Sequence, residues 1–223
     1  NEVVFTSGAT AAINLVAYSW GLKNVSAGDE IIITIAEHHA NIVPWQLIAQ
    51  QKGAKIIAAQ VNPEEDFDAE IIKQLVTDKT KIIAFPHVSN VLGTVFPVKE
   101  ICKIAKECGA ISVVDGCQGI IHGTVDVKKL DCDFYCFSGH KLYGPTGIGL
   151  LVLSNNLIKS YNLCGQINGK QQWGFRAGTE NTCSIGGAIV ALSDTFKNRL
   201  TKNKHLLTLR NLTIKCLSEK FDY

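Results

Sequence analysis

A single lysine stands among many small residues between positions 137 and 149. Lys141 follows Ser138 and His140, and three glycines and one proline occupy the next eight positions. A lysine at the end of a buried strand can be held in a dry pocket, where the loss of solvation favours the neutral, nucleophilic amine. Such an amine forms a Schiff base with a carbonyl compound. The same residues could also form a solvent-exposed glycine-rich hairpin, so the choice depends on other residues.

Three further places offer polar groups where an apolar run ends or the chain turns. Asp115 follows an apolar strand pattern, where a carboxylate is costly unless a cation meets it. His38 also follows a strand pattern; it could stack on an aromatic ring, act as an acid or base, or only hydrogen-bond its loop. The turn 7–10 could bind an anion through backbone N–H groups, or Ser7 or Thr10 could simply cap a helix.

Strand and helix patterns that would position these residues alternate along most of the chain. The expected strands cover residues 2–6, 31–35, 54–61, 81–85, 111–114, 134–137 and 148–153. The expected helices cover residues 11–20, 44–52, 68–76, 97–108 and 126–130. This order predicts the α/β class: three layers, with a mainly parallel seven-stranded sheet and helices on both faces. His38, Asn90, Asp115 and Lys141 then fall at the carboxyl ends of strands, where they can share one crevice.

The C-terminal part of the chain does not follow this alternation. Residues 165–178 read as a loop, a helix begins at Asn181, and residues 202–220 read as a second, amphipathic helix. The chain contains no methionine and stops directly after this pattern. We therefore expect a large domain over residues 1–195, followed at 196–223 by a helix that leads to a small domain mostly absent from the sequence.

Composition narrows the class of protein. Apolar residues make up 46%, charged residues 19%, and the formal net charge is +2, which indicates a globular protein and argues against nucleic acid as a partner. The eight cysteines contain no Cys-x-x-Cys pair, so we expect buried free thiols, not a metal site, and hence a reducing compartment, the cytoplasm or an organelle. No apolar run approaches 18 residues and no signal peptide is visible, so no membrane segment is expected.

One kind of cofactor would use all of these polar groups together. A pyridine aldehyde phosphate needs an amine for its aldehyde, an anion near its ring nitrogen, donors for its phosphate and a flat cover for its ring. Lys141, Asp115, the turn 8–10 and His38 supply one of each. The protonated ring nitrogen would be the cationic partner that Asp115 needs.

Four longer segments carry a resemblance to a known family. Residues 37–45, 87–94, 131–135 and 138–149 resemble cysteine desulfurases of the aminotransferase class V family, and the likeness extends over the chain. The resemblance implies the large domain of a pyridoxal-phosphate enzyme of fold type I, nearest to the SufS-like branch. The run 176–181, Arg-Ala-Gly-Thr-Glu-Asn, is instead more similar to the NifS/IscS-like branch.

The resemblance also implies roles for single residues around the cofactor. Lys141 matches the lysine of the Schiff base, Asp115 the aspartate at the pyridine nitrogen, and Gln118 the donor to the phenolic oxygen. His38 matches the histidine that stacks on the ring and handles protons, and Asn90 a residue near the cofactor and the substrate carboxylate. The remaining cofactor contacts implied are Ala9, Thr10, Ser138 and His140 at the phosphate, and Thr179, which would reach the cofactor of the other subunit in a homodimer.

The implied activity converts L-cysteine to L-alanine and passes the sulfur to an enzyme cysteine as a persulfide, for an acceptor protein in iron–sulfur cluster or other sulfur-compound assembly. The cysteine and the substrate-binding arginine that serve this step in the family have no counterpart in residues 1–223, and Cys164 and residues 165–166 depart from the family pattern. We therefore expect the chain to be inactive alone. A selenocysteine lyase, another class V lyase, and an inactive cofactor-binding module in a sulfur-transfer complex remain alternatives.

Overall fold

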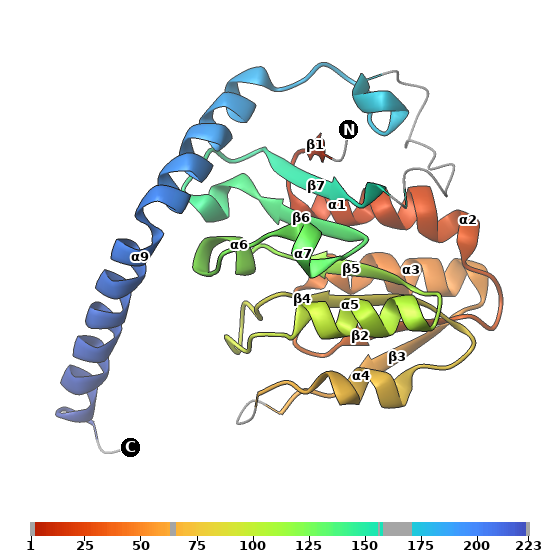
Figure 1. The fold of residues 1–223 in the computed structure, drawn as a ribbon, viewed down its shortest axis with the longest axis horizontal. Helices are drawn as coiled ribbons and strands as arrows, with labels where there is room; N and C mark the ends of the chain where they lie inside the picture. The colour runs from red at the N-terminus through yellow and green to blue at the C-terminus, as the bar shows by residue number, and fades with distance from the viewer. Residues whose placement is uncertain (1–2, 63–65, 156, 158–170, 222–223) are drawn as a thin grey trace.

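The computed structural model describes residues 3–62, 66–155, 157 and 171–221. These residues build one seven-stranded sheet with helices packed against it (Figure 1). The strands are β1 (Val3–Thr6), β2 (Glu30–Thr34), β3 (Lys55–Ala59), β4 (Thr80–Pro86), β5 (Ile111–Asp115), β6 (Phe134–Ser138) and β7 (Gly149–Leu153).

The order of the strands is β1-β7-β6-β5-β4-β2-β3. The five strands from β6 to β3 pair in parallel, and β7 lies antiparallel to both of its neighbours, β1 and β6. Parallel neighbours end at the same edge of a sheet, so the segments after β2, β4, β5 and β6 gather there. The predicted mainly parallel, seven-stranded sheet is confirmed.

Helices cover both faces of the sheet, as predicted. Helices α1 (Ala9–Val16) and α3 (Val43–Lys52) bury Ile13 and Trp45 against one face. Helices α4 (Ala69–Leu75), α5 (Val98–Glu107) and α7 (Val127–Leu130) pack on the other face, where Ile72 and Ile101 are fully buried. The sheet is thus the middle of three layers.

The central strands are apolar on both faces because both faces are covered. In β4, Ile82 and Ala84 enter the core beneath α1 and α3, while Ile83 and Phe85 enter the core beneath α4 and α5. The same alternation places Cys136 of β6 in the first core and Tyr135 in the second. The continuous apolar runs of the sequence are therefore buried strands.

Short helical turns connect several of these elements; apart from residues 17–20, which lie in the helix predicted over 11–20, the sequence patterns did not predict them. They are the π-type turn η1 (Ala17–Gly21), α2 (Leu22–Asn24), η2 (His39–Asn41), α6 (Gly119–His122), η3 (Gly139–Leu142) and η4 (Gln171–Gly174). The last of these falls in the loop predicted at 165–178, whose residues 165–170, like Cys164, lie outside the described residues. A single turn has too few residues to show a period, so pattern analysis misses it.

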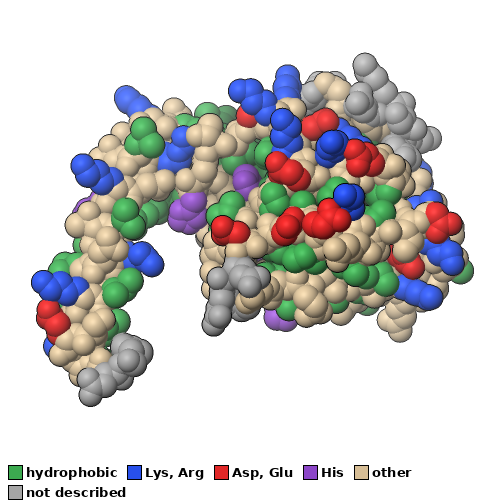
Figure 2. All heavy atoms as spheres, turned by 60° about the horizontal axis from the view of Figure 1, so that its bottom comes forward, with side chains coloured by type: hydrophobic (Ala, Val, Ile, Leu, Met, Phe, Trp, Pro, Cys, Tyr) green, Lys and Arg blue, Asp and Glu red, His purple; other side chains and the backbone are tan. Residues whose placement is uncertain are grey.

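The C-terminal helix corrects one prediction. Residues Thr182–Ser218 form one continuous helix of 37 residues, α9, where two helices were expected. No glycine or proline lies between residue 188 and its end, so nothing in the sequence breaks it. Its contacts with the body include hydrogen bonds from Arg199 to the Gly123 carbonyl and from Asn203 to the His122 carbonyl. Figure 2 shows the rest of the helix extending away from the body.

The cysteines of the described residues are free thiols, but they are not all buried. Cys102, Cys132 and Cys136 lie in the cores, whereas Cys183 and Cys216 are exposed on α9. Cys108 and Cys117 are half-buried. The expectation of buried thiols is therefore wrong for Cys183 and Cys216, because much of α9 has no layer packed over it, and it holds only in part for Cys108 and Cys117. Among the described residues, no helix is long and apolar enough to cross a membrane.

Candidate active site

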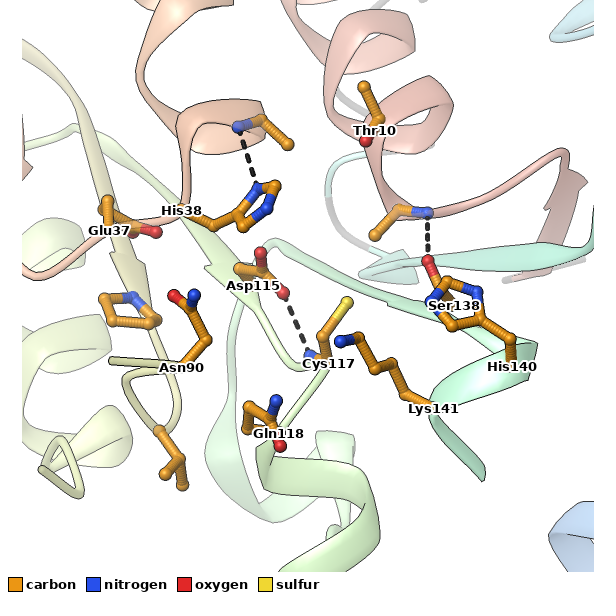
Figure 3. A pocket seen from close by; sticks show the side chains of 14 residues that line it. Thr10, Glu37, His38, Asn90, Asp115, Cys117, Gln118, Ser138, His140 and Lys141 are labelled. Atoms are coloured by element: carbon orange, nitrogen blue, oxygen red, sulfur yellow. Dashed lines mark hydrogen bonds between the residues drawn. The ribbon is translucent and has the colours of Figure 1, made fainter. Parts of the chain in front are cut away.

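A cavity of about 290 Å³ opens at the edge of the sheet where the parallel strands end (Figure 3). Nine of the ten residues predicted to bind a cofactor line this cavity; Thr179 does not. The lining residues are Ala9, Thr10, Glu37, His38, Ala40, Pro86, Val88, Asn90, Asp115, Cys117, Gln118, Ser138, His140 and Lys141. They come from five separate segments of the chain, so only the fold brings them together.

Asp115 is the buried anion of the cavity. It is the last residue of β5 and is only 7% exposed. Its Oδ1 accepts a hydrogen bond of 2.9 Å from the backbone N–H of Cys117. Burial, followed by the charge of Asp115, raises the pKa of the Cys117 thiol, so this thiol stays protonated beside the carboxylate. A carboxylate with so little solvent favours a cationic ligand.

The turn after Asp115 has a fixed shape because two glycines in it lie close to aromatic rings, the buried Tyr135 and the half-buried His87. A Cβ atom on Gly116 would lie 2.0 Å from the Tyr135 ring, and one on Gly119 would lie 2.4 Å from the His87 ring. The two rings are linked by a 2.9 Å hydrogen bond between His87 Nδ1 and the Tyr135 hydroxyl. Burial lowers the pKa of His87, which favours its neutral form. The pair thereby positions both Asp115 and Gln118.

His38 lies on the opposite wall of the cavity, just before the turn η2. Its Nδ1 accepts a 3.1 Å hydrogen bond from the backbone N–H of Ala40. In the neutral ring the proton then sits on Nε2, an assignment made from this hydrogen bond. Figure 3 shows the ring beside Asp115. His38 therefore contributes a flat ring and one ring N–H group to the cavity, beside Asp115.

The start of α1 and the end of β6 form a third wall. The backbone N–H of Ala9 donates a 2.8 Å hydrogen bond to Ser138 Oγ, which ties the two elements together. The first N–H groups of a helix have no acceptor within the helix, and its dipole favours an anion at that end. Thr10 and His140 line the cavity at the same place, so this wall is suited to a phosphate group.

Lys141 reaches the cavity from the turn η3, directly after β6. Figure 3 shows its amine directed toward Cys117. The expectation of a lysine in a dry pocket does not hold for this chain by itself, because the residue is solvent-exposed. The physical reason is its position: η3 is a single turn at the rim of the cavity, where α9 packs against the side of Leu142 and leaves Lys141 exposed.

Thr179 lies away from the cavity on an exposed stretch before α9. The nearby residues are tied to the edge of the sheet: Gln172 donates 2.9 Å to the Phe5 carbonyl of β1, and Glu180 accepts from Arg176 at 3.3 Å. The role implied for Thr179 in a second subunit remains a prediction.

Two lining residues with ionisable side chains, Glu37 and Cys117, were not among the predicted cofactor contacts. Glu37 is followed by Asn41 and Trp45 at intervals of four, and these three side chains are hydrogen-bonded in series, at 2.7 Å and 2.9 Å. The spacing was visible in the sequence. It could not be interpreted there, because an acidic residue in a loop is normally exposed.

The donor set of this cavity fits pyridoxal phosphate. Asp115 is a buried anion in need of a cation, Lys141 supplies an amine, α1 supplies N–H groups for a phosphate, and His38 supplies a flat ring. The volume suits a small organic cofactor. Among the described residues, no group of three or more His, Cys, Asp or Glu side chains is placed to hold a metal ion.

Comparison with known proteins supports the same cofactor, because the chain is similar to pyridoxal-phosphate enzymes. The chain is 45% identical over 205 residues to a cysteine desulfurase of Salmonella newport, which covers 86% of this chain and 50% of that protein. Among solved structures, the cysteine desulfurase CsdA of Escherichia coli aligns with a TM-score of 0.81 and 37% identity, over 86% of this chain and 51% of its own. The apo cysteine desulfurase of Thermococcus onnurineus NA1 aligns with a TM-score of 0.84 and 34% identity, over 98% and 58%.

The chain thus spans about half the length of the curated relatives it matches. The family model described as aminotransferase class-V matches residues 1–217, nearly the whole chain. The match covers every strand of the sheet and every residue that lines the cavity. The chain therefore belongs to the aminotransferase class-V family.

Proposed function

We propose that this chain is the pyridoxal-phosphate-binding part of a cysteine desulfurase. The observation that carries the proposal is the convergence of Lys141, Asp115, His38 and Gln118 on one cavity, next to a helix start suited to a phosphate. Pyridoxal phosphate is the cofactor of this family, and the relatives named above are cysteine desulfurases. When bound, it supplies an electron-withdrawing ring that stabilises negative charge at the α-carbon of an amino acid.

Each residue of the cavity then has a stated task. Lys141 Nζ holds the cofactor through its aldehyde and, when the substrate is bound, takes up and returns the proton of the α-carbon. Asp115 holds the proton on the ring nitrogen, and Gln118 donates to the phenolic oxygen. His38 covers the ring and handles a second proton through Nε2. The phosphate is held by Ala9, Thr10, Ser138 and His140, and Asn90 orients the substrate carboxylate.

The activity of the whole protein is part of the same proposal. Its substrate is L-cysteine, its products are L-alanine and a persulfide on a cysteine outside residues 1–223, and an acceptor protein takes the sulfur for iron–sulfur cluster assembly. We assign it to the SufS-like branch and to the cytoplasm. We also propose a homodimer, in which Thr179 reaches the cofactor of the other subunit, and a division at residue 195 between the cofactor domain and a segment leading to a small C-terminal domain.

The test of this function is covalent labelling of Lys141. The protein is mixed with pyridoxal phosphate, its visible absorption is recorded, and borohydride is added before peptide mapping by mass spectrometry. We expect a visible band and one reduced adduct per chain, on the peptide that contains Lys141. Lys141→Ala should lose both, while the control Lys99→Ala, at an exposed lysine of α5, should keep both. An adduct found mainly on another lysine would overturn the assignment.

A further inference from the structure

Glu37 is a buried acid in the cavity to which the proposed function gives no task. The residue is 8% exposed, although glutamate is almost never buried without a partner. Its Oε1 accepts a 2.7 Å hydrogen bond from the Asn41 amide, and Asn41 in turn accepts 2.9 Å from the Trp45 indole N–H. Its Oε2 is buried and has no hydrogen-bond partner. The side chain is therefore held firmly through one oxygen only.

Figure 3 shows Glu37 extending toward Asp115, the anion proposed to face the ring nitrogen of the cofactor. Two carboxylates that share a site cannot both be ionised without a large cost, so one of them takes a proton. The contacts decide which one. Asp115 has the Cys117 N–H at 2.9 Å to stabilise a negative charge, whereas a charge on Glu37 Oε2 would be buried without a donor. A proton on Oε2 removes that cost.

We propose that Glu37 is a neutral carboxylic acid that positions Asp115 electrostatically, keeping the pair at one proton and one negative charge, with the charge on Asp115. The proposal deepens the proposed function and rests on it, because it concerns the charge offered to the cofactor ring. Glu37 is a positioning residue: it acts through Asp115 and touches no reacting atom. Because protonated Glu37 carries no charge, Asp115 is the one carboxylate of the pair whose charge acts on the ring nitrogen.

The surroundings of Glu37 are consistent with this state. Burial first, and then the charge of Asp115, raise the pKa of Glu37 well above its usual value, while the Asn41 amide and the His38 backbone act in the opposite direction. The titratable groups that face it are Asp115 from β5, Cys136 from β6 and His38 from its own loop. Burial and these same carboxylates also raise the pKa of Cys136, so this thiol contributes no charge.

The first test needs no cofactor. Infrared difference spectra at neutral pH compare the wild-type chain with Glu37→Gln, and with the matched control Glu70→Gln, an exposed acid on α4. We expect Glu37→Gln to lose the carbonyl stretch of a protonated carboxylic acid, whereas Glu70→Gln loses carboxylate absorption. If Glu37→Gln instead loses carboxylate absorption, Glu37 is an anion and the inference is wrong. This result stands whether or not the chain binds pyridoxal phosphate.

The second test measures the affinity for pyridoxal phosphate by its visible absorption. Glu37→Gln keeps an uncharged side chain of the same shape that can still accept from Asn41, so we expect its affinity to stay within about twofold of the wild type, while Glu37→Met, which cannot accept that hydrogen bond, loses about tenfold. Above neutral pH the wild-type affinity should change as Glu37 ionises, and Glu37→Gln should lack that change. Equal loss in the Gln and Met variants, or matching pH profiles, would overturn the inference; failure of the wild type to bind would instead refute the proposed function.

Discussion

At the scale of single residues, the chemistry of this chain depends on how a few polar groups are paired. Asp115 has one backbone donor and little solvent, so its charge is available to a ligand. Glu37 has its hydrogen-bond chain through Asn41 but no donor for its second oxygen. The two carboxyl groups share one cavity and differ in which protonation state their contacts favour. Pairs of this kind are typical of functional sites.

Replacement of Asp115 by Asn tests the anion of the cavity. The change keeps the shape but removes the charge that would bond to a protonated ring nitrogen, and hydrogen bonds to charged groups are worth about 1.5–3 kcal/mol. We expect the affinity for pyridoxal phosphate, measured by titration of the visible band, to fall about 10- to 100-fold. Asp78→Asn, at an exposed residue, serves as the control and should not change it. Unchanged affinity in Asp115→Asn would exclude the proposed contact.

The buried acid also predicts how stability varies with pH. Because the pKa of Glu37 is raised in the folded chain, the fold binds a proton that the unfolded chain has already released above about pH 4.3. The wild type should therefore lose free energy of unfolding as pH rises toward the folded-state pKa, by at most about 1.4 kcal/mol per pH unit, relative to Glu37→Gln. Urea unfolding between about pH 5 and pH 8 measures this difference. A difference that does not vary with pH would contradict a protonated Glu37.

At the scale of elements, the turn between β5 and α6 connects the fold to the site. It begins at the buried Asp115, continues through Gln118 and is closed by the Tyr135–His87 pair beneath it. The backbone N–H of His87 donates 2.8 Å to the Asp115 carbonyl, so the segment after β4 also holds this turn. The geometry of this turn is thus fixed by β5, by Tyr135 of β6 and by His87, which directly follows β4.

A single methyl group on this turn should disturb it. In Gly116→Ala the new Cβ would lie 2.0 Å from the fully buried Tyr135 ring, which has no room to move. Overpacking of this kind costs about 1–3 kcal/mol of unfolding free energy. Gly186→Ala is the matched control, since nothing lies within 4 Å of its added Cβ, and α9 should gain about 1 kcal/mol from the better helix former. Urea unfolding that shows the two variants equally stable would contradict the close packing.

At the scale of the whole molecule, α9 differs from the other described helices because much of its length is not packed against the body. Its first part lies along η3 and α6, where Thr195 is buried and Arg199 is bonded to Gly123. Figure 2 shows hydrophobic side chains along its surface as it leaves the body. Those exposed by more than two fifths are Ile189, Val190, Phe196, Leu200, Leu206, Leu207, Leu209, Leu212, Ile214 and Leu217. A helix without a packed face has little to stabilise it beyond its own propensity.

Limited proteolysis should detect this difference. Beyond Leu206, which still lies against the body, the next trypsin sites are Arg210 and Lys215, and both are exposed. Because the described residues from 204 to 221 are all exposed, local unfolding there removes little packing, and we expect cleavage after these two residues well before cleavage at Lys103 or Lys106 of the packed helix α5. Mass spectrometry of the fragments against time measures the order. Cleavage in α5 first would show that the end of α9 is protected.

The sequence alone determined the fold class and most of the cavity. Apolar runs of strand and helix length alternate along the chain, and burial of apolar surface on both faces of a sheet follows from that order. His38, Asn90, Asp115 and Lys141 could be grouped because each follows a strand pattern, and parallel strands end at one edge. The identity of the cofactor came from resemblance, since several ligands could satisfy a lysine, an aspartate and a helix start.

Other features were decided only by the tertiary structure. Glu37 looks like a loop acid in sequence, and only the tertiary fold, in which η2 packs against α1 and α3, removes Glu37 from water beside Asp115. Lys141 is exposed because η3 lies at the rim, a fact that depends on which elements cover it. The placement of β7 between β1 and β6, antiparallel to both, likewise leaves no local signal. Burial, charge pairing and strand order each depend on residues far apart in the chain, so no local pattern contains them.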